Sequence, residues 1–254
     1  MYSNLVKSLS FLLLLGAQRL CNTQELIGDS SITPECLSKV DNIDNHRYLV
    51  RIQQICEWHI LDILGIIISK SHVISKTLSS WDSGEKCRFT VLSRTNARGE
   101  GGERHGANIT KIGDRAELSL FKLRHPIKIG PRAQVIPVAA KRPEQGAEVL
   151  FISWIRDMGI KGVTAIKATV AEQNICQSFL SGDNDRIDET NFFCTIGFEN
   201  PCPARQDPAL IYNGQLVGIM RSYYQPTPTS NEWDYTYYDV SLYRDTIMRL
   251  IGDM

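Results

Sequence analysis

The chain has 254 residues, of which 43% are apolar and 22% are charged. A chain of this size can bury a substantial core, as one large domain or as two half-domains. It carries 28 basic and 28 acidic residues, so its formal net charge is zero. Partners such as nucleic acid or an anionic membrane usually require a basic excess, and the balanced total therefore indicates neither of them.

The first 23 residues have the pattern of a secretory signal peptide. Lys7 precedes a short apolar run over residues 10–17, which is too short to span a bilayer. Small residues allow cleavage at position 17, with a later option near Thr23, so the cleavage site is expected within residues 17–23. The alternative is a membrane anchor. The pattern predicts a secreted, extracellular protein.

Beyond this signal, residues 24–46 are polar and irregular, and we interpret them as an N-terminal extension that precedes a folded domain over residues 47–254. In that domain, short runs rich in Val, Ile and aromatic residues alternate with Gly, Pro, Asp and Asn, which is typical of an all-β barrel or sandwich. The expected strands contain, in chain order, residues 48–52, 64–68, 89–92, 118–123, 148–154, 163–170, 209–212 and 216–220.

Only the C-terminal segment has helical periodicity. Leu242, Ile247, Leu250 and Ile251 recur at helical spacing after Ser241, which we take as a possible N-cap. The sequence therefore predicts one helix at the end of an otherwise β-stranded domain.

The cysteines suit an oxidising compartment. If signal cleavage removes Cys21, six remain, and an even number is typical of secreted proteins. No two lie at C-x-x-C spacing, so no zinc site is expected. The Gly-rich stretch 99–106 lacks the strand-then-helix context of a nucleotide site, so no cofactor is expected, and we interpret this stretch as an exposed loop. The sequon at Asn108 lies beside it and predicts N-glycosylation.

Five motifs occur in a fixed order along the domain. Residues 65–79 contain G-I-I-I and V-I-S-K-T-L-S, and residues 116–123 read A-E-L-S-L-F-K-L. Residues 202–209 read C-P-A-R-Q-D-P-A and are followed by an apolar run, the hairpin dipeptide Asn213-Gly214 and L-V-G-I. Together they resemble the chymotrypsin–trypsin family, which has G-G-S-L-I, V-V-S-A-A-H-C, N-D-I-A-L-L-K-L and C-x-G-D-S-G-G-P in these places. Two weaker matches are residues 152–154 and residues 237–240 with the helix after them.

This resemblance covers roughly residues 48–254. It implies a trypsin-like fold, which is a double six-stranded antiparallel β-barrel with a C-terminal helix. Peptide hydrolysis on this fold needs a hydroxyl that attacks, an imidazole that takes its proton and a carboxylate that orients the imidazole. Leu78 occupies the imidazole position, and Gln206 occupies the nucleophile position. Glu117 keeps the charge of the orienting carboxylate, so these degenerate positions imply no catalysis.

The parts that support catalysis in this family differ as well. Ala204 replaces a glycine that shapes the oxyanion hole. Arg205 occupies the position of an aspartate that pairs with the new N-terminus after activation cleavage, and it has the wrong charge for that role. Asn200 lies near the position of the pocket-base residue, so no trypsin-like carboxylate is implied there. Arg221 and Tyr223 fall on the substrate-binding strand, and Tyr223 should help to fill the mouth of the pocket.

The resemblance also implies three disulfide bonds. Cys176–Cys194 matches an intact family bridge. Cys202 matches a half-cystine whose family partner is missing, and Cys36 falls near the segment that enters after activation, so we expect Cys36–Cys202. Cys56–Cys87 is then the third pair, although six cysteines allow fifteen connectivities. Both halves of two other family bridges are replaced together, by Ile63 with Ser79 and by Val149 with Tyr212.

These expectations describe a secreted, catalytically inactive serine protease homologue that acts as a binding or regulatory module. Its partner would be an extracellular protein, either a protease, an inhibitor or a protease substrate, and no nucleic-acid or membrane partner is expected. Two alternatives stay open. One is an active hydrolase with relocated catalytic residues, for example Asp207 or Glu117. The other is a secretory protein without a specific binding role.

Overall fold

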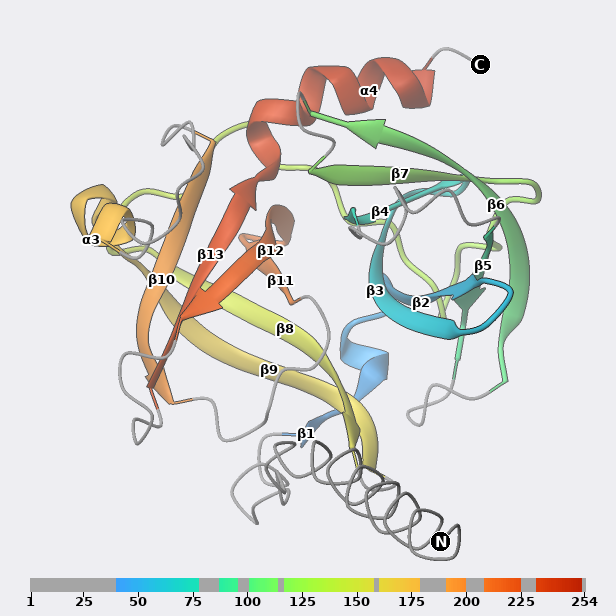
Figure 1. Ribbon diagram of the computed structural model, residues 1–254, viewed down its shortest axis with the longest axis horizontal. Helices are drawn as coiled ribbons and strands as arrows, with labels where there is room; N and C mark the ends of the chain where they lie inside the picture. Colours follow the sequence, from blue (N-terminus) through green and yellow to red (C-terminus); the bar gives the residue numbers. More distant parts are fainter. Residues whose placement is uncertain are drawn as a thin grey trace, which may run out of the picture. The chain divides into compact units, whose positions relative to one another are not determined.

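The computed structural model describes residues 40–77, 87–95, 101–113, 117–157, 160–178, 191–199, 208–224 and 232–252. These parts consist mainly of β-strands (Figure 1). In chain order the elements are β1 Val40–Asp41, η1 Ile43–Asn45, β2 Leu49–Ile55, β3 Ile60–Ser69, β4 His72–Lys76, β5 Arg88–Ser93, β6 Glu103–Ile112, β7 Leu118–Leu123, β8 Glu148–Asp157, β9 Ile160–Val170, α3 Gln173–Ser178, β10 Phe192–Glu199, β11 Ala209–Tyr212, β12 Gln215–Tyr224, β13 Glu232–Asp239, η3 Val240–Tyr243 and α4 Arg244–Gly252.

The first six long strands form a closed antiparallel barrel in the order β2-β3-β4-β7-β6-β5. Its interior is filled by aliphatic and aromatic side chains such as Ile52, Val73 and Phe121, all of them fully buried. Apolar residues at every second position explain this packing, because alternate side chains of a strand point to the same face. Gly65 sits where β3 crosses this core, and a Cβ at that position would clash with Ile52 and Val73.

The later strands form a second sheet in the order β1-β9-β10-β13-β12-β11-β8. An additional pairing between β8 and β9 joins its ends, so that six of these strands also close into a barrel. The short β1 adds to the outer edge of β9 through Val40 opposite Thr164. Residues 40 and 41, which the sequence places in the N-terminal extension, thus join this sheet, and Ile43 is buried in the core.

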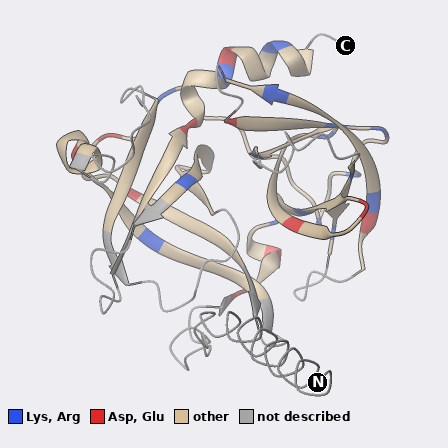
Figure 2. Cartoon of the chain, viewed as in Figure 1, with Lys and Arg blue, Asp and Glu red and all other residues tan. Residues whose placement is uncertain are grey.

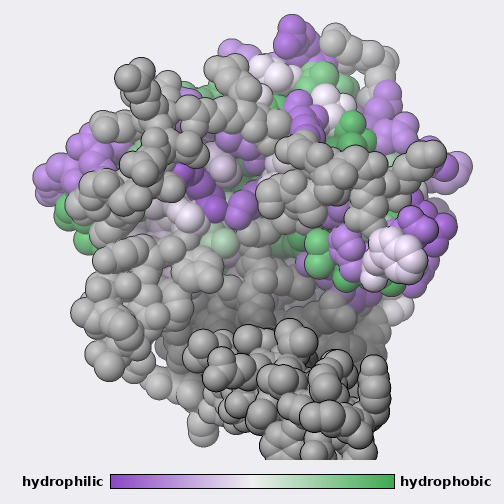
Figure 3. All heavy atoms as spheres, in the orientation of Figure 1, coloured by the Kyte–Doolittle hydropathy of each residue, from purple (hydrophilic) through white to green (hydrophobic). Residues whose placement is uncertain are grey.

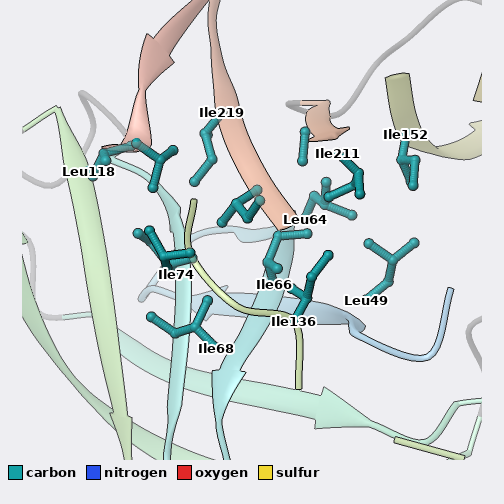
Figure 4. Packing of buried hydrophobic residues seen from close by; sticks show 14 of the residues in the cluster. Leu49, Leu64, Ile66, Ile68, Ile74, Leu118, Ile136, Ile152, Ile211 and Ile219 are labelled. Carbon is teal, nitrogen blue, oxygen red and sulfur yellow. The ribbon is translucent and has the colours of Figure 1, made fainter. Parts of the chain in front are cut away.

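The largest hydrophobic cluster draws residues from both barrels. Leu64 and Ile66 of β3 face Ile211 of β11 and Ile219 of β12 (Figure 4). The terminal helix α4 contributes Ile247 to the same cluster. The expected fold class is therefore confirmed: the chain is all-β, with two six-stranded antiparallel barrels and a short C-terminal helix.

The C-terminal helix begins differently from the sequence expectation. The cap is Asp239, whose Oδ1 accepts a hydrogen bond from the backbone N–H of Ser241 at 3.0 Å. Asp239 is also held by Arg142, whose Nε lies 2.7 Å from Oδ2. The assignment of Ser241 as the cap was wrong, because a 3-10 turn precedes the α-helix. Leu242 is 54% exposed and therefore does not belong to the buried face.

Several elements lie outside the strands and the helix expected from the sequence, among them α3, β6, β10 and most of β13. The helix α3 is only six residues long, which is too short for a helical period to be recognised. Strand β6 includes residues 103–106, so the loop interpretation of the Gly-rich stretch is wrong for these residues. Asn108 consequently lies in a strand, although its side chain is exposed as a glycosylation site requires.

Two disulfide bonds lie within the described residues, Cys56–Cys87 and Cys176–Cys194. They are two of the three pairs that the sequence resemblance implies. The first ties the end of β2 to the start of β5, and the second ties α3 to β10. Residues 36 and 202 lie outside the described residues, so Cys36–Cys202 stays a prediction.

Candidate functional site

Of the positions that resemble catalytic positions, Glu117 is described, and it lies where β4 ends and β7 begins. Lys76 of β4 lies opposite Leu118 of β7. The next residue, Thr77, donates its backbone N–H to the carbonyl oxygen of Glu117 at 3.0 Å. Its hydroxyl lies 2.7 Å from that of Ser119, which is buried. Thr77 directly precedes Leu78 in the sequence, but Leu78 and Gln206 lie outside the described residues.

The side chain of Glu117 is half-buried and packs against Gly113. Its Oε2 is buried and has no hydrogen-bond partner in the described parts of the chain. Gly113 adopts a φ of +93°, and a Cβ on this residue would overlap Oε2. A residue without a side chain at position 113 therefore leaves the space that this carboxylate occupies.

All five histidines of the chain lie within the described residues, and none forms a hydrogen bond to the Glu117 carboxylate. His72 is buried on β4, and its Nδ1 lies 3.0 Å from the hydroxyl of Ser69. Burial lowers the pKa of His72, and the nearby charge of Lys122 lowers it further. This favours the neutral imidazole, which has a structural role between two strands.

His105 is also enclosed between strands of the first barrel. Its Nε2 lies 2.9 Å from the hydroxyl of Ser93, and its Nδ1 lies 3.0 Å from the carbonyl oxygen of His125. Ser93 and His105 are both buried, so this imidazole–hydroxyl pair does not face a groove where a substrate could bind. Two other histidines, His59 and His125, lie in the β2–β3 hairpin and in the loop after β7.

One histidine lines a cavity. His46 Nε2 lies 2.8 Å from Asp41 Oδ2, and His46 Nδ1 lies 3.1 Å from the hydroxyl of Tyr48. Both His46 and Tyr48 line a cavity of about 490 Å³ beside the core that the two barrels share. Its walls also include Gln134, Glu148, Leu150, Lys167, Ile211 and Tyr212. This order of carboxylate, imidazole and hydroxyl is that of a serine protease triad, so these three residues are a candidate for relocated catalysis.

The electrostatics of this arrangement do not suit a nucleophile. Burial raises the pKa of the Tyr48 phenol well above its usual value, and the charge of Asp41 raises it further. Burial alone would raise the pKa of the Asp41 carboxyl. Hydrogen bonds from His46, Asn42 and Asn45 outweigh this effect, so the pKa of Asp41 is lowered overall. A phenol that resists ionisation is a poor attacking group, since the ionised form is the reactive one. The arrangement is better explained as a structural anchor for residues 40–48.

The residues assigned to a degenerate specificity pocket are only partly described. Arg221 is half-buried on β12, and its guanidinium carbon lies 5.7 Å from the ring centroid of Phe192. The backbone of Tyr223 pairs with Tyr235 of β13. Asn200 and Arg205 lie outside the described residues, so their assignment stays a prediction. Val149 and Tyr212, which replace a family bridge together, pack in one hydrophobic cluster.

Groups of His, Cys, Asp and Glu side chains that could hold a metal ion are absent from the described parts of the chain. In the same parts, the helices are not long and apolar enough to cross a membrane.

The folds of several solved proteins match this chain. The scabies mite inactivated protease paralogue S-D1 matches with a TM-score of 0.65 at 17% identity, covering 85% of this chain and 96% of that one. The scabies mite inactivated protease paralogue S-I1 matches with a TM-score of 0.68 at 15% identity, covering 84% and 99%. Kallikrein-related peptidase 10 in complex with Zn2+ matches with a TM-score of 0.61 at 17% identity, covering 82% and 96%.

No protein-family model matches the sequence, and no curated protein does. The structural matches have low sequence identity, so they establish the fold alone. Together with the two closed barrels, they show that this chain has the chymotrypsin/trypsin-like serine protease fold, a fold that includes non-catalytic homologues.

Proposed function

We propose that this chain is a non-catalytic homologue of the trypsin-like proteases and acts outside the cell as a binding or regulatory module. One observation carries the proposal. Every histidine of the chain is described, and Glu117, at the position of the orienting carboxylate, has no imidazole as a hydrogen-bond partner. Without an imidazole, this position lacks the group that in a serine protease takes the proton of the nucleophile and returns it to the leaving group.

Other observations support the same proposal. The sequence has Leu78 and Gln206 where the family has its base and its nucleophile. Two of the matching structures are proteins named as inactivated proteases. The two disulfides support an extracellular location, because such bonds persist mainly in oxidising compartments.

An extracellular protein partner is supported by the hairpin between β2 and β3. Trp58 is 84% exposed at its tip, Ile60 is 62% exposed, and Leu61 is exposed beside them. The Cys56–Cys87 disulfide holds the base of this tip, so these side chains are presented on a constrained loop. Exposed Trp on such a loop is typical of interface hot spots. We infer that the partner, which would be a protease, an inhibitor or a protease substrate, contacts this tip.

The tip can be tested with paired variants. We expect Trp58→Ala/Ile60→Ala to weaken binding of the partner captured from extracellular fluid by about tenfold or more, because a hot-spot Trp contributes most of its energy when buried. The measurement is the Kd of the purified partner by calorimetry. The control is Leu242→Ala/Met248→Ala, which removes exposed apolar side chains from the C-terminal segment instead.

Two outcomes would contradict this proposal. If no protein binds at physiological concentration, the chain is a secretory protein without a specific binding role. If both pairs of substitutions weaken binding equally, the β2–β3 tip is not the contact surface.

The alternative of relocated catalysis finds its best geometric candidate at Asp41, His46 and Tyr48. The raised pKa of the Tyr48 phenol argues against it. We therefore keep relocated catalysis as the second candidate function. Absence of covalent labelling by a fluorophosphonate probe would exclude it.

A further inference from the structure

Although the net charge of the chain is zero, its basic and acidic residues are unevenly distributed along the sequence. Residues 47–135, which contain the first barrel, hold 15 basic and 8 acidic residues, so this part has a net charge of +7. The other residues hold the remaining 13 basic and 20 acidic side chains. An asymmetry of this size between two parts of one chain indicates a surface for an anionic partner.

Within the first barrel, the basic excess falls on particular strands. Strands β4 and β7 contain no Asp or Glu, and β6 contains none after Glu103. The loop over residues 124–135 has none either. Figure 2 shows the same pattern, with blue segments on β6 and on the loop that follows β7. The cations in this region are therefore not balanced by acidic residues on their own strands.

The register of β6 and β7 places three of these cations in a row on the outside of the barrel. His105, Ala107 and Ile109 face the interior, so the alternate positions 104, 106 and 108 face outward at a spacing of about 7 Å. Arg104 occupies the first position. Lys122 of β7 lies opposite the third position, which is Asn108.

The middle position of the row is filled from the neighbouring segment. Arg124 donates its backbone N–H to the carbonyl oxygen of Gly106 at 2.8 Å. Its side chain lies over Gly106, because a Cβ on that glycine would meet Arg124 Cδ at 3.3 Å and Nε at 3.5 Å. The absence of a side chain at position 106 thus allows a guanidinium to lie between Arg104 and Lys122.

These three cations are available for a ligand. Arg104, Lys122 and Arg124 are all exposed, and none of them forms an ion pair within the parts of the chain that the structure describes. The neighbouring Glu103 is instead paired with Arg94. In the space-filling view, hydrophilic side chains gather along the side of the molecule where β6 runs (Figure 3).

More cations extend the row across the next turn. The backbone N–H of Ile127 donates to the carbonyl oxygen of Lys70 at 2.7 Å, which brings the β3–β4 turn against the loop after β7. Lys70 and Lys128 are both exposed there. The basic face, defined as Arg104, Lys122, Arg124, Lys70 and Lys128, is therefore an extended strip built from three segments of the chain.

The residue types of the basic face favour one class of anionic partner over the others. The large exposed apolar side chains of the described residues lie elsewhere, apart from Ile129 and Val135 in the adjoining loop. A protein interface needs an apolar or aromatic centre, and a peripheral membrane contact needs apolar insertion. Single-stranded nucleic acid needs exposed aromatic rings for stacking of its bases. The face offers instead a strip of cations with the polar side chains of Asn108 and Thr110 between and beside them.

We propose that the basic face binds a linear sulfated polysaccharide. Sulfate groups spaced along an extended chain would meet successive cations, and the sugar hydroxyls would bond to Thr110 beside them. This inference does not depend on whether the chain hydrolyses peptides, because the face lies on the outside of the first barrel and uses none of the positions that resemble catalytic ones.

The sequon at Asn108 lies inside this face, so a glycan there would cover part of it. The test therefore uses the full mature chain with Asn108→Gln as the background for every variant. Binding to heparin is measured at several salt concentrations. Controls use unsulfated hyaluronan, single-stranded DNA and vesicles of phosphatidylcholine with phosphatidylserine.

We expect heparin to bind with a strong salt dependence, because counterions are released when cations meet a polyanion. Lys122→Gln/Arg124→Gln should raise the Kd about tenfold or more and lower the slope of log K against log salt by about two. The control Lys141→Gln/Arg249→Gln removes the same charge from exposed positions outside the first barrel and should change the Kd less than about twofold.

Equal effects of the two pairs would show that total charge, not this face, determines binding. Equally tight binding of hyaluronan, DNA or the vesicles would contradict the choice of a sulfated polysaccharide. Absence of heparin binding at physiological salt in the Asn108→Gln background would overturn the proposal outright.

Discussion

Replacing both Cys176 and Cys194 by alanine is expected to lower the free energy of unfolding by about 3 kcal/mol or more. The bond closes a loop between residues 18 apart in the sequence, and releasing it returns that loop's entropy to the unfolded chain. Both residues are fully buried with Phe192 between α3 and β10, so the substitution also removes packing. Urea denaturation of wild type and variant, followed by tryptophan fluorescence, measures the difference.

The matched comparison is Cys56→Ala/Cys87→Ala. Its loop is longer, with a separation of 31 residues, so the entropic part of the loss should be slightly larger. The packing part should be smaller, because Cys87 is only half-buried at the surface. If neither pair changes the denaturation midpoint, the disulfides contribute nothing to the stability of the second and first barrels.

Replacing Gly113 by alanine is expected to cost more than replacing Gly146, which has a similar positive φ but open space around it. Part of the loss, about 1–2 kcal/mol, comes from holding a side chain at a positive φ. The rest comes from displacing the Glu117 carboxylate, whose buried Oε2 occupies the space of the new methyl group. Thermal or urea denaturation gives the total.

Two controls separate these contributions. Gly146→Ala has a similar φ of +78° with open space around it, so it should show the backbone cost alone. In a Glu117→Ala background, Gly113→Ala should lose less than in the wild type, since the colliding carboxylate is gone. The backbone cost and the close approach of the new Cβ to the Tyr243 ring at 3.1 Å remain. Equal losses at Gly113 with and without Glu117 would show that the carboxylate does not pack against this glycine as described.

The sequence predicted the fold because its strongest strands are continuous apolar runs. Residues 118–123 and 209–212 match β7 and β11 at both ends. Strand β6 was not predicted from the sequence. Its inward residues include His105 and Ala107, which are not strong β-formers, and its outward residues are polar. Alternation was present, but the glycines before it favoured a loop interpretation.

The candidate site could be predicted only in part. The position of Glu117 followed from the resemblance, but its buried and unpartnered Oε2 depends on Gly113, four residues earlier, and on the positive φ there. The contact of His46 with Asp41 and Tyr48 was missed because the segment had no regular pattern. The closeness of these three residues in the sequence is the one signal that could have suggested it.

The basic face was missed for a different reason. The total charge of zero suggested no anionic partner, yet a count by segment shows the asymmetry directly. What the count cannot show is that Arg124 reaches over Gly106 to lie between Arg104 and Lys122. That placement depends on the pairing of β6 with β7, which is a property of the folded barrel.

We propose that this chain lacks the proton acceptor and the nucleophile of a protease. The most direct test is to incubate the purified mature chain with a fluorophosphonate probe and to measure covalent labelling by intact mass and peptide mapping. We expect no labelling above that of the unfolded chain, and no change in the Tyr48→Phe variant. Stoichiometric labelling at a single residue, in the folded wild type and not in the unfolded chain, would contradict the proposed loss of catalysis.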